Sequence, residues 1–235
     1  MKLVLLSSNT QHHWYFINKL KNYGIIFDSI IFETTFIKAK FDASSPWEKK
    51  QLNFEKKRWK KLVKPTEKIK LVKNINSLES LDFLKELGPK IGIVFGTRKL
   101  GKDILNIFNS RLLNIHRGIA QEYRGLDCEF WPIYHKDFTN IGVTIHKVDN
   151  SLDTGDVVFQ KRLNISKDVY CYNLRAYTTE LALKMIVKIL TDYKKDKKFK
   201  KIRQKKIGRY YSFMPSILKK SIQNNIQNYI NVKSQ

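Results

Sequence analysis

Short apolar runs of strand length alternate with helical patterns along the first half of this chain. The runs cover residues 2–7, 25–33, 69–72, 91–95 and 112–116, and segments with helical spacing or helix caps separate them. Such alternation indicates βαβ units, because two parallel strands need a crossover connection, which is usually a helix. We therefore expect an α/β fold, with a Rossmann-like, mostly parallel open sheet flanked by helices.

Two more strands and a long helix follow in the second half. The strands are expected at residues 141–147 and 157–163, and the helix at 169–191 carries an apolar stripe that is typical of core packing. A basic run and an aromatic stretch come after this helix. We therefore divide the chain into a main domain of residues 1–192 and a short C-terminal appendage of residues 193–235.

The charge is strongly unbalanced, with 45 Lys and Arg against 21 Asp and Glu and a net charge of +24. Residues 49–73 and 194–206 hold much of the positive charge. Charge runs are most often solvated helix faces, and we favour that interpretation. Because basic surfaces attract phosphates of any kind, a nucleotide-phosphate or nucleic-acid surface comes second and a membrane surface last. We do not expect a nucleic-acid partner.

Neither the cysteines nor the first residues indicate export. Cys128 and Cys171 form no metal-type spacing and no disulfide framework, so we expect free thiols in a reducing compartment. The start of the chain lacks the apolar core and cleavage site of a signal peptide, and no apolar run approaches the length of a membrane span. We expect a cytoplasmic protein without a membrane partner.

Two other kinds of site match the sequence less well. Residues 96–103 (GTRKLGKD) nearly match a P-loop, but Asp103 stands where Ser or Thr would hold magnesium. His116 and His146 have aspartates nearby, yet no H-x-x-x-H or H-x-H spacing exists and a clear third neutral ligand is missing. We expect a glycine turn that shapes a ligand pocket, and no metal.

Three polar side chains at the ends of predicted strands form the strongest functional signal. Asn114 and His116 alternate on one strand and therefore point the same way, while Asp153 lies in a tight L-D-T-G turn. Acyl transfer to an amine needs a donor for the oxyanion and a base for the amine proton. An amide can be that donor, and an imidazole with a carboxylate beside it can be that base, so no metal is needed. Taken singly, each of these residues could have a purely structural role, as a strand-end histidine or a turn aspartate. That explanation accounts poorly for all three together.

The residues around these three form an extended pattern. It reads L-L-N-I-H-x-G-x-x-x-x-Y-R-G over residues 112–125 and I-G-V-T-I-H-x-V-D-x-x-L-D-T-G-D over residues 141–156. This pattern resembles the folate-dependent formyltransferases. The resemblance implies their fold, 10-formyltetrahydrofolate as co-substrate, no metal, and Asn114, His116 and Asp153 as the catalytic triad.

The resemblance also implies where the folate binds, in a site made mostly of backbone at two loops. These loops contain Phe95, Gly96 and Thr97 before the triad, and Val148, Asp149 and Asn150 before the aspartate. The family often has proline or serine after the histidine, whereas Arg117 stands here. We therefore expect Arg117 and the loop of residues 121–124 to contact a different formyl acceptor.

Among the acceptors of this family, a nucleotide-linked amino sugar fits best. The tRNA enzymes carry a C-terminal barrel, for which the residues after the long helix are too few, and the glycinamide ribonucleotide enzymes have no reason for a basic aromatic appendage. The chain most resembles the homodimeric enzymes of O-antigen and lipopolysaccharide synthesis that act on dTDP-4-amino-4,6-dideoxyglucose. Formylation of methionyl-tRNA or glycinamide ribonucleotide, and an inactive nucleic-acid-binding protein, are the alternatives.

We expect cationic and aromatic side chains to contact the acceptor. Lys or Arg pairs with a diphosphate, and an aromatic ring stacks on a base with about 1–3 kcal/mol. C-terminal aromatic side chains suit a dimer contact equally well. The expected acceptor contacts are His13 and Trp14 as exposed residues after the first strand, Arg117, Tyr123, Arg124 and His146 near the triad, and Arg209, Tyr210, Tyr211 and Phe213 in the appendage.

Overall fold

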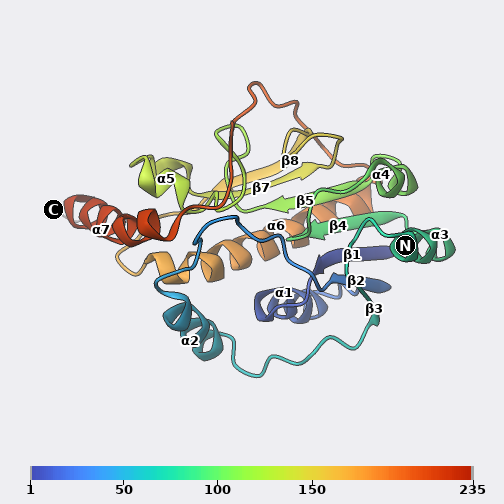
Figure 1. Cartoon of the computed structure of the whole chain (residues 1–235). Helices are drawn as coiled ribbons and strands as arrows, with labels where there is room; N and C mark the ends of the chain where they lie inside the picture. The colour runs from blue at the N-terminus through green and yellow to red at the C-terminus, as the bar shows by residue number, and fades with distance from the viewer. Residues whose placement is uncertain (1, 234–235) are drawn as a thin grey trace.

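Seven strands form one open sheet in the computed structural model, which describes residues 2–233. Their order is β3-β2-β1-β4-β5-β7-β8. The first five pair in parallel, and β7 is antiparallel to both of its neighbours. The strands are β1 (Leu3–Ser8), β2 (Ser29–Glu33), β3 (Lys68–Val72), β4 (Ile91–Phe95), β5 (Leu112–His116), β7 (Gly142–Lys147) and β8 (Val157–Arg162). The expected Rossmann-like, mostly parallel α/β sheet is confirmed (Figure 1).

Helices cover both faces of this sheet. One face packs against α1 (Gln11–Lys21) and α6 (Leu174–Asp196), and the other against α3 (Leu78–Leu87) and α4 (Lys102–Phe108). The remaining helices are α2 (Glu48–Arg58), α5 (Trp131–Tyr134), α7 (Ser216–Lys233) and the 3₁₀ turns η1 (Phe138–Asn140) and η2 (Cys171–Asn173). The sheet is therefore the middle of three layers.

The sequence of β1 explains why it lies in the interior of the sheet. Leu3 and Leu5 pack with α1 and α6, whereas Val4 and Leu6 pack with α3 and α4. A strand with helices on both faces is apolar throughout rather than alternating, because neither face meets water. The continuous apolar run at the start of the chain is the signature of that position.

Two helices begin later than their local signals predict. Ser45 is a residue type that favours an N-cap and Pro46 one that favours a first helical turn. However, α2 begins at Glu48, and Trp47 occupies the N-cap position without a side-chain cap. Trp47 is instead buried edge-on against Phe130, with ring centroids 5.6 Å apart. The long helix α6 begins at Leu174, after the turn η2. Tertiary packing outweighs weak local preferences at both starts.

The C-terminal residues pack into the rest of the molecule. The short strand β9 (Arg209–Tyr211) pairs in parallel with β6 (Tyr123–Gly125). Helix α7 lies beside α5, at the end of the molecule away from α3 and α4 (Figure 1). Met214, Ile222 and Ile226 are buried in a hydrophobic cluster that includes Leu174 of α6. The division after residue 192 thus stays a prediction, and the structure shows a core shared across it.

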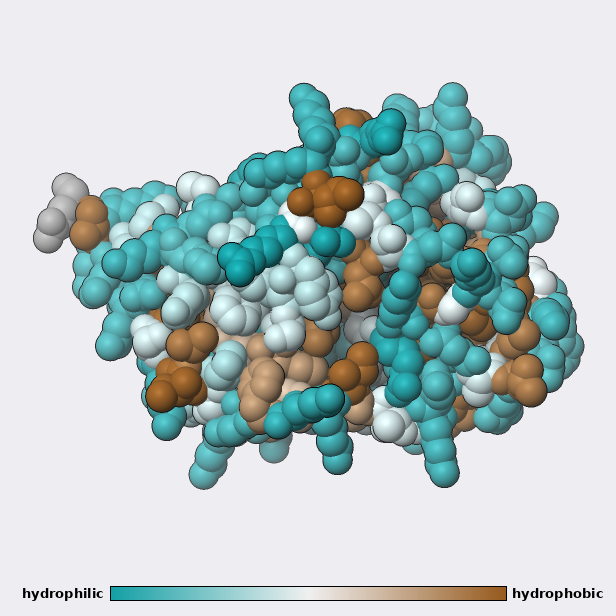
Figure 2. All heavy atoms as spheres, turned by 45° about the horizontal axis from the view of Figure 1, so that its top comes forward, coloured by the Kyte–Doolittle hydropathy of each residue, from teal (hydrophilic) through white to brown (hydrophobic). Residues whose placement is uncertain are grey.

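Within residues 2–233, no helix combines the length and the apolar character that crossing a bilayer requires. The face shown in Figure 2 is mostly hydrophilic, with apolar side chains in small separate groups. Scattered apolar side chains of this kind are normal on a folded protein.

Candidate active site

A cavity of about 360 Å³, here called the strand-end cavity, lies where β4 and β5 end. Open α/β sheets bind ligands at the carboxyl ends of their strands, near the point where the strand order reverses. Most of the residues expected from the sequence line it, namely Phe95, Gly96, Thr97, Asn114, His116, Arg117, His146, Val148, Asp149, Asp153, Tyr210 and Phe213. Asn150, expected at the folate, is exposed and lies outside this lining.

Asp153 is the centre of a polar cluster in the strand-end cavity. Its Oδ2 accepts a hydrogen bond from the Gly125 N–H at 2.9 Å, and its Oδ1 lies 3.1 Å from Asn114 Nδ2 and 3.2 Å from His146 Nε2. Burial of Asp153 disfavours its charged form, but His116, His146 and the Gly125 N–H outweigh it and hold the pKa of Asp153 well below its usual value. Asp153 is therefore a permanent negative charge at neutral pH.

The hydrogen bonds of His116 fix which ring nitrogen is available as a base. Its Nε2 lies 2.8 Å from the carbonyl oxygen of Tyr123. A carbonyl only accepts, so Nε2 carries the proton of the neutral ring and Nδ1 has a free lone pair. Nδ1 lies 3.4 Å from Asp153 Oδ2. Burial lowers the pKa of His116, and the charge of Asp153 offsets part of that effect. The ring is thus a neutral base beside a carboxylate.

His146 fixes the orientation of Asn114. Its Nδ1 lies 2.8 Å from the carbonyl oxygen of Lys147 and must donate to it, because a carbonyl oxygen only accepts. Nε2 lies 3.1 Å from Asn114 Nδ2. Asn114 Nδ2 thus donates to Asp153 Oδ1 and lies within hydrogen-bond distance of His146 Nε2. Its Oδ1 forms no hydrogen bond among the described residues.

The turn that carries Asp153 is held from two sides. Gly155 is needed there, because a Cβ would lie 1.8 Å from the carbonyl oxygen of Lys147. Gln204 reaches in from the C-terminal segment, and its Nε2 donates to the carbonyl oxygens of Asp153 at 2.9 Å and Gly155 at 2.8 Å. Sequence reasoning missed Gln204, because nothing in its local pattern connects it to a turn some fifty positions earlier.

The two outer arginines do not line the strand-end cavity. Arg124 was expected to contact the acceptor, but its Nε donates to the carbonyl oxygen of Gly208 at 2.6 Å and its NH1 to that of Leu152 at 2.8 Å. Arg124 thus ties three segments together. Arg209 is exposed, and its guanidinium lies 5.5 Å from the ring centroid of Tyr211.

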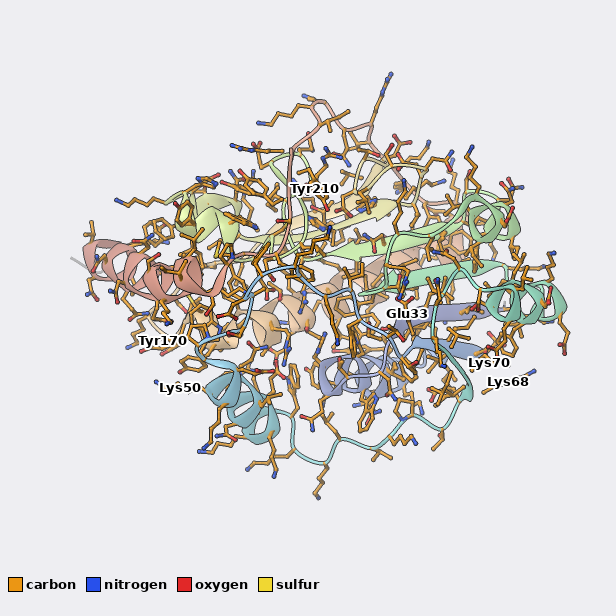
Figure 3. The ribbon with its side chains drawn as sticks, viewed as in Figure 1. Glu33, Lys50, Lys68, Lys70, Tyr170 and Tyr210 are labelled. Carbon is orange, nitrogen blue, oxygen red and sulfur yellow. The ribbon has the colours of Figure 1, made fainter. Side chains whose placement is uncertain are left out.

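The tyrosines near the cavity divide into two groups. Tyr211 stacks on Tyr123 and Trp131, with ring centroids 5.4 and 4.9 Å apart, and the hydroxyl of Tyr123 donates to Asp137. These contacts place Tyr123 and Tyr211 outside the cavity lining, against expectation. Tyr210 points to the other side of β9, because strand side chains alternate. It lines the cavity, is 50% exposed, and stands on the C-terminal segment over the sheet (Figure 3).

The turn after β1 is more enclosed than the sequence predicts. His13 is 3% exposed, and its ring packs edge-on against Phe95 at 4.6 Å. A Cβ on Gly96 would lie 3.0 Å from His13 Nε2, so the loop passes directly over this ring. Burial lowers the pKa of His13 to about 3. Trp14 is half-buried and donates to Asn9. The expectation that His13 is exposed to the acceptor is wrong.

Glu33, which sequence reasoning did not single out, holds the loop of residues 96–100. This carboxylate ends β2 and is 4% exposed. It accepts hydrogen bonds from the N–H groups of Ile75 at 2.9 Å and Arg98 at 3.1 Å, and from the Arg98 guanidinium. An acidic residue at the end of an apolar strand was the available signal.

Arg117 lines the strand-end cavity, as expected, and one of its guanidinium N–H groups is available for a ligand. Its Nε lies 3.6 Å from Glu129 Oε2. Its NH1 is buried and forms no hydrogen bond within residues 2–233. Glu129 belongs to a stretch, residues 126–129, that lines the cavity without having been predicted to do so. The unused donor suits an anionic or carbonyl group of a ligand.

Known sequences match this chain through its middle. The model of the Formyl transferase family matches residues 48–190, more than half of the chain. Over 124 residues the chain is 32% identical to the methionyl-tRNA formyltransferase of Finegoldia magna, which covers 52% of this chain and 40% of that protein. Over 125 residues it is 34% identical to the bifunctional polymyxin resistance protein ArnA of Wigglesworthia glossinidia brevipalpis. This match covers 49% of this chain and 19% of that protein. The chain thus spans less than half the length of these relatives.

Solved structures share the fold at low sequence identity. The X-ray structure of a sugar N-formyltransferase from a Shewanella species matches with a TM-score of 0.62 at 18% identity, covering 90% of this chain and 77% of that one. A second match is the formyltransferase PseJ of Anoxybacillus kamchatkensis in complex with UDP-4,6-dideoxy-4-formamido-L-AltNAc and tetrahydrofolate. Its TM-score is 0.56 at 18% identity, and the match covers 89% of this chain and 85% of that one.

Proposed function

The chain belongs to the formyl transferase family, and we propose that it transfers a formyl group from 10-formyltetrahydrofolate to the amine of a nucleotide-linked amino sugar. The observation that carries this proposal is the cluster of Asn114, His116, His146 and Asp153 in a ligand-sized cavity. The cluster combines a neutral base, a permanent carboxylate and a polar amide, which formyl transfer to an amine requires.

In this proposal the folate binds between the loop of residues 95–100 and the loop of residues 148–152. All of the first loop, and all of the second except Asn150, line the strand-end cavity. The first loop is anchored by Glu33, and the second carries Asp153 into the cluster. A pocket whose walls are pre-formed loses less entropy on binding than one that must be ordered. The tetrahydrofolate complex among the similar structures supports this assignment.

The proposed reaction begins with attack of the acceptor amine on the formyl carbon. The new C–N bond forms as the electrons of the carbonyl double bond move to oxygen. His116 Nδ1 takes the proton from the amine, and Asp153 stabilises the imidazolium that results. The intermediate collapses when the bond to the folate nitrogen breaks, and His116 returns the proton to that nitrogen.

We assign the oxyanion to Asn114, which must turn to reach it. In the structure the Nδ2 hydrogens of Asn114 face His146 and Asp153, so donation to the oxyanion requires a half-turn of the amide. Asn114→Asp keeps an acceptor and loses the donor. If kcat falls as far in Asn114→Asp as in Asn114→Ala, the donor role is supported, whereas partial activity of the Asp variant would contradict it.

The proposed acceptor is dTDP-4-amino-4,6-dideoxyglucose, used in O-antigen or lipopolysaccharide synthesis by a homodimer in the cytoplasm. Tyr210 and Phe213 present aromatic surface to the strand-end cavity, which suits a nucleotide base. The unused NH1 of Arg117 suits a diphosphate oxygen. The similar sugar N-formyltransferase structures support this class of acceptor.

Methionyl-tRNA is the second candidate acceptor. The observation in its favour is the sequence identity to a methionyl-tRNA formyltransferase, which covers about half of this chain. The triad and its chemistry would be unchanged, because both acceptors present a primary amine.

Mass spectrometry of the acceptor after incubation with 10-formyltetrahydrofolate tests the function. The acceptors are dTDP- and UDP-linked amino sugars, glycinamide ribonucleotide and methionyl-tRNA, each with the wild type and with His116→Ala and Asp153→Ala. We expect a formyl mass gain on one amino sugar that both substitutions remove. A gain on charged tRNA alone would overturn the acceptor, and no gain on any substrate would overturn the activity.

A further inference from the structure

A second and larger hollow, of about 880 Å³, lies away from the strand-end cavity. It runs between α1, the end of α2 and the segment that follows α2, and it shares no lining residue with the cavity. We call it the lysine groove, because its walls include Lys19, Lys21, Lys57, Lys60, Lys61 and Lys64. Arg58 and a single carboxylate, Glu180, complete its charged lining.

Most of the lysines in this groove have no acidic partner among residues 2–233. Lys21 pairs with Glu67 at 2.9 Å, and Arg58 pairs with Glu180. The other five lysines form no ion pair within the described part of the chain. The groove is thus strongly positive after the internal pairs have been counted. Its charge contrasts with the second basic run, where several lysines pair with acidic side chains.

The groove is built on a fixed framework. Arg58 donates two hydrogen bonds of 2.5 and 2.8 Å to the carboxylate of Glu180 on α6. Trp59 Nε1 donates to the same carboxylate at 3.0 Å. Asn18 of α1 pairs through both its amide atoms with the backbone of Val63, at 3.0 Å each. The lysines on this segment therefore project from a backbone that is held at both of its ends.

We propose that the lysine groove binds the phosphate backbone of a nucleic acid. Ammonium groups at several points along a groove match the repeated charges of a phosphate chain. The aromatic rings beneath the groove, Tyr15 and Trp59, are buried and stack on each other at 4.4 Å, so they offer no exposed face to a base. Binding is therefore independent of sequence. A bilayer surface is flat and would meet only the rim of a hollow.

Salt-dependent binding of short RNA and DNA duplexes tests this proposal. The test variant carries Lys57→Gln, Lys60→Gln and Lys64→Gln, and the matched control carries Lys194→Gln, Lys195→Gln and Lys198→Gln, which are exposed outside the groove. Both lose the same charge. Each lysine that contacts a phosphate contributes about 1 to the slope of log affinity against log salt. We expect the slope to fall by about 3 in the test variant and by less than about 1 in the control.

Parallel titrations with polyglutamate and anionic lipid vesicles identify the anion. Equal losses of affinity in the two triple variants would overturn the proposal, as would binding of polyglutamate or vesicles as tight as that of the duplexes. A stronger loss on RNA than on DNA, or the reverse, names the natural ligand. Formyl transfer to the amino sugar should be unchanged in the test variant, so a failure here is distinct from a failure of the proposed activity.

Discussion

The strand-end cavity and the lysine groove differ in whether their charged side chains have partners. In the cavity, the carboxylate of Asp153 has partners on Gly125, Asn114, His116 and His146. In the groove, five ammonium groups have no carboxylate partner within residues 2–233. In the cavity, each group influences the protonation state or the orientation of its neighbour. In the groove, the charges are separate from one another and lie on a fixed backbone.

Solvent access explains this difference. An ion removed from water without a partner costs several kcal/mol, so a buried carboxylate persists only where donors surround it. An exposed ammonium keeps its water and small counter-ions and releases them when a polyanion binds. Substitutions in the cavity should therefore be strongly coupled to each other, whereas substitutions in the groove should add.

The largest effect is expected from His116→Asn. The substitution removes the proton acceptor from the network while keeping a polar side chain of similar size. We expect kcat for formyl transfer to fall by about 10²–10⁴-fold, the usual contribution of a general base. His135→Gln, at an exposed histidine outside the cavity, is the control and should retain wild-type kcat. Near-normal turnover of His116→Asn would remove His116 from the mechanism.

Two neighbouring tyrosines sharpen the assignment of the acceptor site. Tyr210 lines the cavity, whereas Tyr211 is stacked on Tyr123 and Trp131 outside it. Loss of a stack worth about 1–3 kcal/mol should raise KM for the nucleotide sugar roughly 5- to 150-fold in Tyr210→Ala. In Tyr211→Ala we expect the main change in Tm instead. The reverse pattern in KM and Tm measurements would move the base away from Tyr210.

Glu33→Gln tests the support of the folate loop without touching the triad. The carboxylate binds the backbone and guanidinium of Arg98, and a neutral amide holds them less strongly. We expect KM for the folate to rise roughly tenfold, equivalent to about 1.4 kcal/mol, with little change in kcat. Glu86→Gln on exposed α3 is the matched control. A fall in kcat with unchanged KM would show that Glu33 acts on the chemistry rather than on the loop.

The smallest expected effect is the position of the acid limb in the pH profile. His116 works as the neutral form, which exists above its pKa, and burial lowers that pKa below 6.5. The kcat/KM ratio should therefore be flat near neutrality and should fall only as the pH drops through this lowered value. At pH 6 a histidine of ordinary pKa would be only roughly a quarter neutral, and the enzyme should keep a larger fraction of its plateau than that.

Asp153→Asn extends the same measurement. The charge of Asp153 raises the pKa of His116, so its removal should move the acid limb to still lower pH while kcat also falls. An acid limb at or above pH 6.5 in the wild type would contradict a buried neutral base. A shift to higher pH in Asp153→Asn would contradict the contact between the two groups.

Much of the fold followed from local pattern. The apolar run Leu3–Leu6 of β1 is typical of a strand buried on both faces. Ser77 and Gly88 are residue types that favour the two ends of a helix, and in α3 the Ser77 hydroxyl accepts from the Ser80 N–H and Gly88 is left-handed. The alternation of Asn114 and His116 placed both at one strand end, and the structure brings them to Asp153. These features depend on neighbours in the sequence or on the rule that parallel strands end at one edge.

The sequence by itself determined the layers of this protein, the strand that carries Asn114 and His116, and the turn that carries Asp153. Only the tertiary structure decided that His13 is buried beneath Gly96, that Gln204 holds the Asp153 turn, and that part of the first basic run lines a groove. Strand and helix patterns arise from interactions with a period of a few residues, which a sequence displays directly. A counter-ion, a buried ring or a groove arises from segments that meet only after folding, and no local pattern encodes which segments those are.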